Sequence, residues 1–441
     1  MRPRGGASRW WLHHSLAALT QSIEKAGVNL HILRGAAGEL VPAIAKAANA
    51  GAVYWTRRYD AAGIAVDRQI KQRLREQNVE ARSFNGQLLF EPWEIETKSA
   101  TPYGVFTPFW KSALAKSGLE RPLPRVTKII NSAWPRNAPD KISLEELELL
   151  PTKPDWAGGL RKRWTPGEAG ARQRLKTFLD GPLANYTSDR DRPDRDATSF
   201  LSPHLAFGEI SPRTIWHAVQ HRIGEQSDIA AAGHKFLSEI GWREFSYHLL
   251  FFNPDLATNN YNGKFDNFAW REPNAATRNA WTQGRTGVPI VDAGMRELWQ
   301  TGYMHNRVRM IVASFLVKNL LIDWREGERW FWDTLCDADP ANNAAGWQWV
   351  AGSGADAAPY FRIFNPVLQG EKYDPNGEYV RAYVPEIAGL PDKLVHKPWD
   401  APTDLLKTTR PQSGVSYPEP LVDLKVSRER ALEAFRALGT R

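Results

Sequence analysis

Hydrophobic and polar positions alternate between a strand-like and a helix-like period in the first hundred residues. A strand-like run, VNLHIL, starts at Val28 and is followed by a helix-like run, GELVPAIAKAANAG. The next segments are AVYW, which is strand-like, an amphipathic helix from Asp60 to Gln77, and ARSFNGQLLF, which is again strand-like. This alternation predicts a parallel sheet joined by right-handed crossovers. One helix, about Ser8 to Ala26, comes first with no strand ahead of it, so we expect the sheet to lack its first strands.

The pattern changes after the sheet region. Residues 121–166 are rich in proline, lysine and polar residues, with a short acidic helix expected from Ser143 to Leu150. A helix is expected to open at TPGE, with Thr165 as its cap and Pro166 in its first turn. Beyond it the helical period dominates to about residue 350, as in HKFLSEIGWREFSYHLLFF and NRVRMIVASFLVKNLLIDW.

The chain therefore divides into three parts. We expect an incomplete doubly wound α/β domain over 1–122, a linker over 123–164 and a larger, all-α domain over 165–441. A length of 441 residues is in keeping with two domains, since single cores seldom grow that far.

Composition narrows the function classes. A net charge of +8 favours an anionic partner such as nucleic acid. The single cysteine, Cys336, excludes an intrachain disulfide and fits a reducing compartment. No apolar run approaches the roughly 20 residues of a membrane helix. We expect a cytoplasmic protein, monomeric and without membrane contact.

Two polar groups stand out in the helical half. Thr198, Ser199 and Ser202 place three hydroxyls before the helix-like HLAFG, where they could donate hydrogen bonds to a phosphate; a simple helix cap is the commoner role of such a cluster. Asp337 and Asp339, in LCDADPANN, could form a solvated loop or a metal site, but the lone cysteine and the lack of nearby histidines argue against metal.

Residues 304–366, MHNRVRMIVASFLVKNLLIDWREGERWFWDTLCDADPANNAAGWQWVAGSGADAAPYFRIFNP, resemble the photolyase and cryptochrome family almost throughout. NYTSDRDRPDRDATSFLSPHLAFGEISPR and SEIGWREF extend the resemblance over 165–441, and a weaker one covers 1–122. It implies a class I cyclobutane pyrimidine dimer photolyase, shortened at its N-terminus, in which FAD repairs DNA under light.

The resemblance assigns the FAD site. It implies that the diphosphate is held by the hydroxyl loop and by an arginine, and that an Arg309 to Asp337 ion pair flanks the ring. Asn343 matches the position that faces the reactive ring nitrogen, where a neutral amide can donate or accept. The implied set is Tyr186, Thr198, Ser199, Leu201, Ser202, Arg243, Arg309, Asp337, Asp339 and Asn343.

A lesion pocket follows from the same resemblance. Glu239 and Trp242 share one helix face, and Asn306 and Met310 share another. In the family, Trp242 and Trp349 would stack on the dimer and Glu239 would bond the pyrimidine edge. Arg190, Arg307 and Arg362 match positions near the DNA backbone.

The resemblance also implies an electron relay through Trp347, Trp324 and Trp270, the last on the weakest alignment. If GWQW is extended, Trp347 and Trp349 point to opposite sides, one to the flavin and one to the pocket. A core or surface position is the alternative role for Trp270.

An antenna pigment is not expected. Folate-binding relatives carry an Asn-Glu pair where this chain has Ala62 and Gly63, and the expected first strands, which help to hold a folate or deazaflavin, are missing. We therefore expect FAD as the one cofactor.

Three rivals remain beside dimer repair. A cryptochrome would signal without repair. Repair of six-four photoproducts would need histidines at Asn306 and Met310, since an amide and a thioether cannot deliver a proton. A shortened chain could also fold poorly and do nothing.

Overall fold

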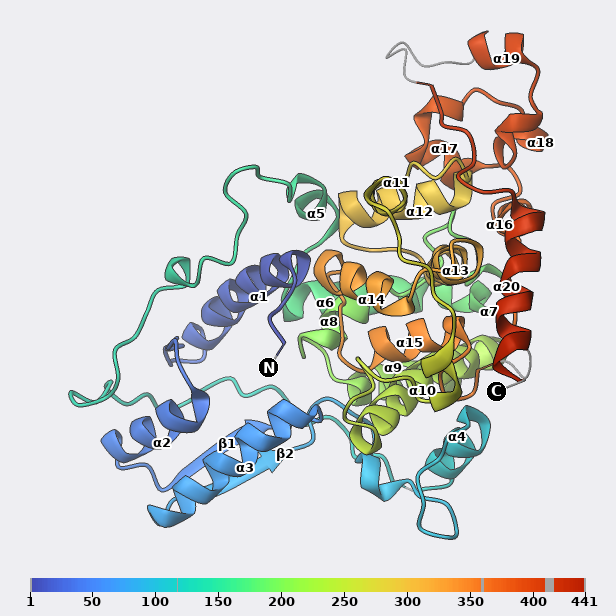
Figure 1. The fold of residues 1–441 in the computed structure, drawn as a ribbon. Helices are drawn as coiled ribbons and strands as arrows, with labels where there is room; N and C mark the ends of the chain where they lie inside the picture. The colour runs from blue at the N-terminus through green and yellow to red at the C-terminus, as the bar shows by residue number, and fades with distance from the viewer. Residues whose placement is uncertain (1, 117, 358–360, 409–415, 440–441) are drawn as a thin grey trace. The chain divides into compact units, whose positions relative to one another are not determined.

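The computed structural model describes residues 2–116, 118–357, 361–408 and 416–439. The chain forms two compact units that interleave along the sequence (Figure 1). The first unit contains Met1–Ala157, Trp164–Asp180 and Ser199–Pro254, and the second contains Gly158–Arg163, Gly181–Thr198 and Asp255–Arg441. Residues 358–360, the APY of the family-like segment, lie outside the described residues.

The first unit holds both strands of the sheet. Its elements are α1 (Gly6–Glu24), α2 (Ala37–Ala47), β1 (Ala52–Thr56), α3 (Ala61–Glu76), β2 (Glu80–Phe84), η1 (Pro92–Glu94), α4 (Phe106–Ala115), η2 (Glu145–Leu147), α6 (Glu168–Asp180), α8 (Ser202–Ala206), α9 (Pro212–Glu225), η4 (Ser227–Ile229) and α10 (Ala230–Phe252).

The predicted alternation produces a parallel pair. β1 and β2 run parallel, in register from Ala52 opposite Glu80 to Thr56 opposite Phe84. Helices α2 and α3 pack on one face through a small core that contains Ala45, Ile70, Leu74 and Val79. The confirmed elements are those with a clear hydrophobic period.

The predicted strand at 28–33 is wrong. Ile32 makes one isolated antiparallel bridge, to Ile142, and the neighbouring residues join no ladder. A strand requires a hydrogen-bonded partner along its length. β1 and β2 pair with each other, and residues 28–33 join neither of them in the described sheet.

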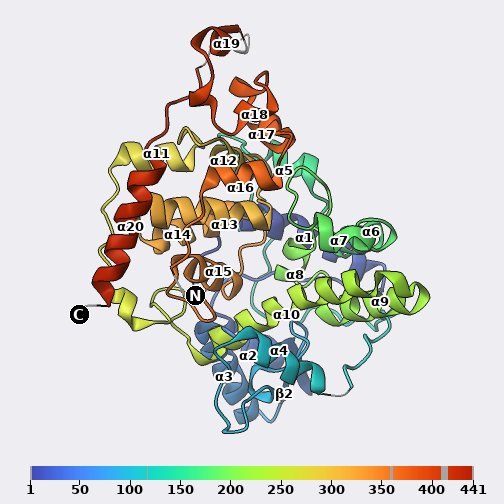
Figure 2. The same ribbon diagram turned by 90° about the vertical axis from the view of Figure 1, so that its right-hand side faces the viewer.

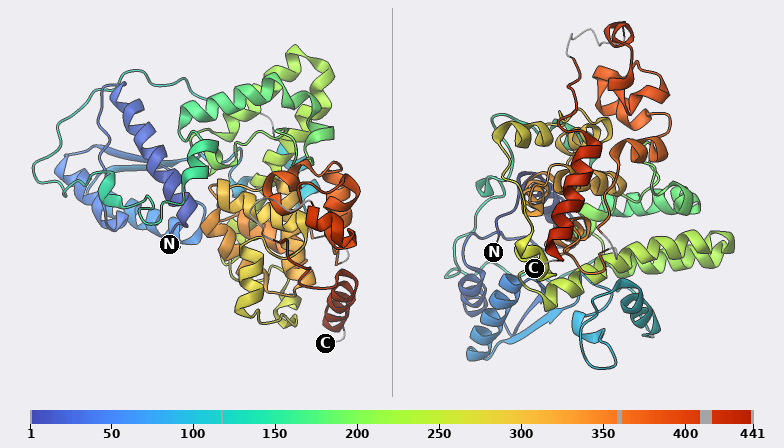
Figure 3. Two further views of the ribbon diagram at one scale, coloured as in Figure 1. Left: turned by 90° about the horizontal axis from the view of Figure 1, so that it is seen from above. Right: turned by 45° about the vertical axis from the view of Figure 1, so that its right-hand side comes forward.

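The rest of the first unit is helical, and α9 lies beside α10 in Figure 2. Residues 118–144 form an extended segment with no helix or strand (Figure 3). The expected acidic helix at 143–150 is limited to the single turn η2, because Glu148 adopts a left-handed conformation (φ 52°). The expected start at Thr165 is also wrong: Gly167 has φ +103°, and α6 begins at Glu168.

Described residues of the second unit form only helices and loops. The elements are α5 (Gly158–Arg163), η3 (Pro182–Asn185), α7 (Tyr186–Asp189), η5 (Gly263–Asn267), α11 (Ala275–Thr282), α12 (Pro289–Thr301), α13 (Asn306–Ser314), the π-helical turn η6 (Phe315–Asn319), α14 (Trp324–Thr334), α15 (Asn342–Ala351), α16 (Pro366–Tyr373), α17 (Glu378–Tyr383), η7 (Pro385–Ile387), α18 (Asp392–Val395), η8 (Pro398–Asp400), α19 (Thr403–Thr408) and α20 (Leu424–Leu438).

A large core joins α12, α13, α14 and α15 in this unit, with Val291, Val312, Trp324 and Trp347 among its buried members. GWQW lies within α15, so the expected extended conformation of this segment is wrong. Two residues apart on a helix differ by about 200° in direction. Trp347 and Trp349 therefore point to different sides of α15: Trp347 is buried and Trp349 is half-buried.

Candidate flavin and lesion site

The hydroxyl loop leads directly into α8. The Leu201 N–H donates to Ser199 Oγ at 3.4 Å, and Ser202 is the first residue of α8. Two residues on, His204 Nδ1 lies 2.5 Å from Glu209 Oε2, and Glu209 Oε1 accepts from the Trp11 indole at 3.0 Å. This buried network fixes α8 against α1, and with it the loop.

Thr198, at the end of its segment, belongs to the second unit. There it lies near the phenol of Tyr303. Burial raises the pKa of Tyr303 to about 12, and the Arg309 charge and the Thr198 hydroxyl act in the opposite direction. The Arg309 guanidinium lies over the Tyr303 ring, 5.3 Å from its centre. Thr198 and Arg309 thus both lie beside Tyr303.

The predicted ion pair between Arg309 and Asp337 is present and bidentate. Arg309 Nη1 and Nη2 donate to the two oxygens of Asp337 at 3.1 and 2.8 Å, and Nε donates to the Met304 carbonyl at 2.7 Å. Such a paired fork is the strong form of an arginine–carboxylate contact. Thr198, Tyr303, Arg309 and Asp337 therefore form one polar group within the second unit.

Asn343 is held by a residue that sequence reasoning missed. Its Nδ2 donates to Glu328 Oε1 at 2.7 Å and to the Glu328 carbonyl at 3.0 Å. Glu328, on α14, is 3 % exposed. An ionised carboxylate only accepts, so it fixes the amide with its nitrogen toward α14.

Asp339 has a structural task beside its predicted one. Its Oδ1 accepts from the backbone N–H groups of Ala341 and Asn342 at 2.9 and 2.8 Å. These bonds satisfy the start of α15, which carries Asn343, Trp347 and Trp349. Any role of Asp339 toward FAD stays a prediction.

The three relay tryptophans lie in the second unit. Trp324 is fully buried, and its indole N–H donates to Asn260 Oδ1 at 2.9 Å. Trp347 is 3 % exposed, and its buried Nε1 has no hydrogen-bond partner among the described residues. Half-buried Trp270 contacts Phe268, with 4.3 Å between ring centres.

Trp347 depends on a glycine for its position. A Cβ at Gly327 would lie 2.1 Å from Cη2 of Trp347, so the indole lies against the bare backbone of α14. Gly327 lies one turn after Trp324 on α14, so Trp347 of α15 packs against the helix that carries Trp324. Trp281, missed by sequence reasoning, lies 6.3 Å from Trp347 between ring centres.

The predicted lesion residues of the first unit lie on α10. Trp242 stacks on Phe106 of α4, with 3.8 Å between ring centres and 11° between planes. Glu239 forms an ion pair with Lys235 at 3.0 Å. Arg243 is buried, donates to the Gln87 carbonyl at 2.6 Å and lies over the Tyr247 ring. Its predicted phosphate contact stays untested.

The predicted lesion residues of the second unit lie on α13 and α15. Asn306 is the exposed first residue of α13, and Met310 is one turn further along it. Trp349 Nε1 donates to the Asp356 carbonyl at 3.1 Å. Exposed Arg362 lies 5.0 Å from the centre of the Phe364 ring.

The predicted backbone-binding arginines are already engaged. Arg307 Nη2 donates to Asp191 at 2.9 Å, and its guanidinium lies 4.4 Å from the centre of the Tyr373 ring. Arg190 lies over the ring of Tyr186, the buried first residue of α7. Both arginines belong to the second unit.

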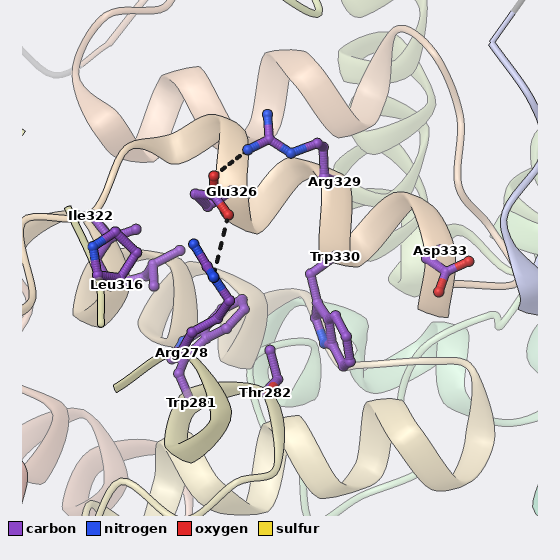
Figure 4. Close-up of a pocket in the computed structure, with 10 residues that line it drawn as sticks. Arg278, Trp281, Thr282, Leu316, Ile322, Glu326, Arg329, Trp330 and Asp333 are labelled. Carbon is purple, nitrogen blue, oxygen red and sulfur yellow. Dashed lines mark hydrogen bonds and ion pairs between the residues drawn. The ribbon is translucent and has the colours of Figure 1, made fainter. Parts of the chain in front are cut away.

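A pocket of about 260 Å³ lies elsewhere in the second unit (Figure 4). Among its lining residues, Glu326 forms ion pairs with Arg278 and Arg329, and Trp281 and Trp330 supply aromatic rings. Its lining includes none of the predicted site residues. The described part of the chain contains no cluster of three metal-ligating side chains and no helix able to span a membrane.

Two family models match most of the chain. Residues 1–127 match the DNA photolyase model, and residues 236–437 match the FAD binding domain of DNA photolyase. A deoxyribodipyrimidine photo-lyase from Agrobacterium fabrum is 53% identical over 439 residues, which cover 99% of this chain and 90% of that protein. The chain belongs to the photolyase and cryptochrome family.

Relatives in this family include both repair enzymes and cryptochromes. Cryptochrome-1 of Arabidopsis thaliana is 38% identical over 98% of this chain and 64% of its own length. The crystal structure of a class III photolyase from Agrobacterium tumefaciens superposes with a TM-score of 0.93 at 52% identity, covering 100% of this chain and 90% of that one. The expected fold class and the FAD-binding domain are thus confirmed.

Proposed function

We propose that this protein repairs cyclobutane pyrimidine dimers in DNA in a light-dependent reaction that requires FAD. The observation that carries the proposal is the 53% identity, over nearly the full length of both chains, to a deoxyribodipyrimidine photo-lyase. The reaction class is a carbon–carbon lyase, with dimer-containing DNA as the partner. We further propose that the protein acts as a monomer.

The donor set fits FAD. The proposed diphosphate ligands are the hydroxyls of Thr198, Ser199 and Ser202 with Arg243, beside Tyr186 and Leu201. The bidentate pair of Arg309 and Asp337 offers a fixed charge pattern to a heterocyclic ring. Because Glu328 holds the nitrogen of Asn343, the amide oxygen is the atom left to accept from a ring N–H.

The chemistry that FAD supplies when bound is donation of one electron to the dimer after excitation, with return of that electron after ring opening. Trp347, Trp324 and Trp270 are the proposed residues that pass electrons inward to restore the reduced form. Burial of Trp324 and Trp347 keeps water from both rings.

Glu239, Trp242 and Trp349 are proposed to bind the everted dimer, with Asn306 and Met310 beside it. Everting a base pair costs a few kcal/mol, and less for a damaged pair, which gives selectivity. Phe106 stacks on one face of Trp242, and the dimer is proposed to stack on the other. Arg190, Arg307 and Arg362 are the proposed phosphate contacts.

We propose class III as the photolyase subclass of this chain. The class I assignment finds no support in the comparisons, and the 52% identity to a class III photolyase favours class III. A cryptochrome function is the second candidate, because cryptochromes are relatives at 38% identity. Asn306 and Met310 argue against six-four repair, as neither delivers a proton.

Blue-light assays on an oligonucleotide with one dimer test the proposal. We expect the purified protein to show bound flavin in its absorption spectrum and to remove dimers only in light. If the dimers remain although the protein carries intact, reduced flavin, repair is rejected and a cryptochrome function is favoured.

Glu239→Gln tests the lesion site. Losing a charge-assisted hydrogen bond should slow repair about 10- to 100-fold. The flavin spectrum should not change, because Glu239 is assigned to the dimer and not to FAD. Loss of colour in this variant would show that Glu239 has been misplaced.

A further inference from the structure

Arginines around α7 form ion pairs with the aspartates of the same segment. Four arginines, Arg190, Arg192, Arg195 and Arg307, lie with three carboxylates, Asp189, Asp191 and Asp194, in the second unit. Arg195 pairs with Asp189 at 3.0 Å, and Arg192 Nε donates to Asp194 at 2.7 Å. The remaining two arginines share Asp191.

Asp191 lies in the turn after α7. Its Oδ2 accepts from Arg307 at 2.9 Å, and its Oδ1 lies 3.9 Å from Arg190 Nε. The side chain of Arg307 is 16 % exposed and that of Asp191 is 31 % exposed. The pair is thus within reach of solvent, and a phosphate could replace the carboxylate.

We propose that Asp191 is an internal competitor of DNA phosphate: it occupies Arg307 and Arg190 in the free protein and thereby weakens binding to all DNA. This inference rests on the proposed function, which makes these two arginines backbone contacts. Both groups bind the same guanidinium edge, since carboxylate and phosphate oxygens accept in the same geometry.

The alternative is that Asp191 orients Arg307 for the phosphate. Other contacts already do so. Arg307 lies 4.4 Å from the centre of the Tyr373 ring, and its backbone N–H donates to His305 Nδ1 at 3.2 Å in the first turn of α13. With the backbone of Arg307 and the face of its guanidinium held, the carboxylate contributes mainly its charge.

Asp191→Asn removes that charge with little change of shape. A unit charge about 6 Å from a bound phosphate changes affinity about 3-fold at the dielectric constant of water and about 10-fold at half that value. We expect undamaged and dimer-containing duplexes to bind more tightly by the same factor. The slope of log affinity against log salt should steepen by up to about 0.9.

The measurement is fluorescence anisotropy in a salt series on full-length, flavin-containing protein. Asp191→Glu keeps the charge and should bind as the wild type does. Asp392→Asn is the matched control, because Asp392 also pairs with an arginine, Arg381 at 3.0 Å, in the second unit. In an Arg307→Gln background the gain from Asp191→Asn should shrink.

Unchanged or weaker binding by Asp191→Asn would overturn the inference, as would an equal gain by Asp392→Asn or an undiminished gain in the Arg307→Gln background. A wild-type protein without preference for dimer-containing DNA contradicts the proposed function instead. The two failures are therefore distinguishable within one data set.

Discussion

Gly327 is the residue at which one methyl group should matter most for the tryptophan cluster. Its absent Cβ leaves the space that the Trp347 ring fills. Gly327→Ala should displace the indole and lower the free energy of unfolding by about 1–3 kcal/mol, as overpacking does. Light-driven flavin reduction should slow as well.

Gly346→Ala is the matched control on α15. A Cβ there meets nothing within 4 Å, and the position is exposed next to Trp347. It should stabilise the helix by about 0.5–1 kcal/mol. Urea unfolding of both variants decides the point: equal midpoints would show that Trp347 does not need the bare backbone.

Glu328 gives a second test at the level of one side chain. Glu328→Gln replaces a charge-assisted bond to Asn343 by a neutral one, which should cost about 1 kcal/mol of stability and allow the amide to turn. Repair should slow with flavin still bound. Glu326→Gln, at a half-buried position of α14, should leave repair unchanged; equal effects of both variants would contradict a specific role.

Packing of α10 against the loop before α4 makes one histidine sensitive to pH. His248 Nε2 accepts from the Tyr103 N–H at 3.0 Å, and Nδ1 lies 3.2 Å from the Pro92 carbonyl. Burial lowers the pKa of His248 to about 4. The neutral ring is therefore the form that the folded state holds.

The sign follows from the two states. In the unfolded chain His248 has its ordinary pKa of 6.5, whereas in the folded chain its pKa is about 4. The stability that the neutral His248 ring contributes is therefore fully present above pH 6.5 and is lost as the pH falls to 4. His248→Gln should flatten the pH dependence by up to about 1.4 kcal/mol per pH unit. Parallel wild-type and variant curves from urea unfolding would refute this.

Elements with a strong period could be predicted from sequence, and those that depend on a partner could not. The helices around Ile70 and Ile240 follow from periodicity, and β1 from its apolar run. Residues 28–33 have the same apolar character, but a strand also needs a ladder. The start of α6 was missed because the left-handed Gly167 outweighs the cap signals of Thr165.

Site residues within a motif could likewise be predicted from sequence, and those that depend on a distant contact could not. Motif residues such as Arg309, Asp337 and Asn343 follow from the family resemblance of their segment, and the structure shows the implied ion pair. Lys235 could have been found, since it is one turn from Glu239. Phe106 and Asp191 contact their partners across more than a hundred residues, so no local pattern marks them.

For the whole molecule, FAD should act as a folding ligand. A ligand that binds only the folded state stabilises it by about 2.7 kcal/mol at a hundredfold excess over its dissociation constant. Protein stripped of flavin should therefore melt at a lower temperature and regain the midpoint on addition of FAD, but not of free adenine. An unchanged midpoint in differential scanning fluorimetry would argue against specific FAD binding.

The stack of Phe106 on Trp242 has an optical consequence. One face of the indole is covered by Phe106, so an aromatic ring that arrives can stack on the opposite face. A nucleobase that comes into contact there should quench that emission. The difference in fluorescence between the wild type and Trp242→Phe would then report, without any attached dye, when a lesion has been captured.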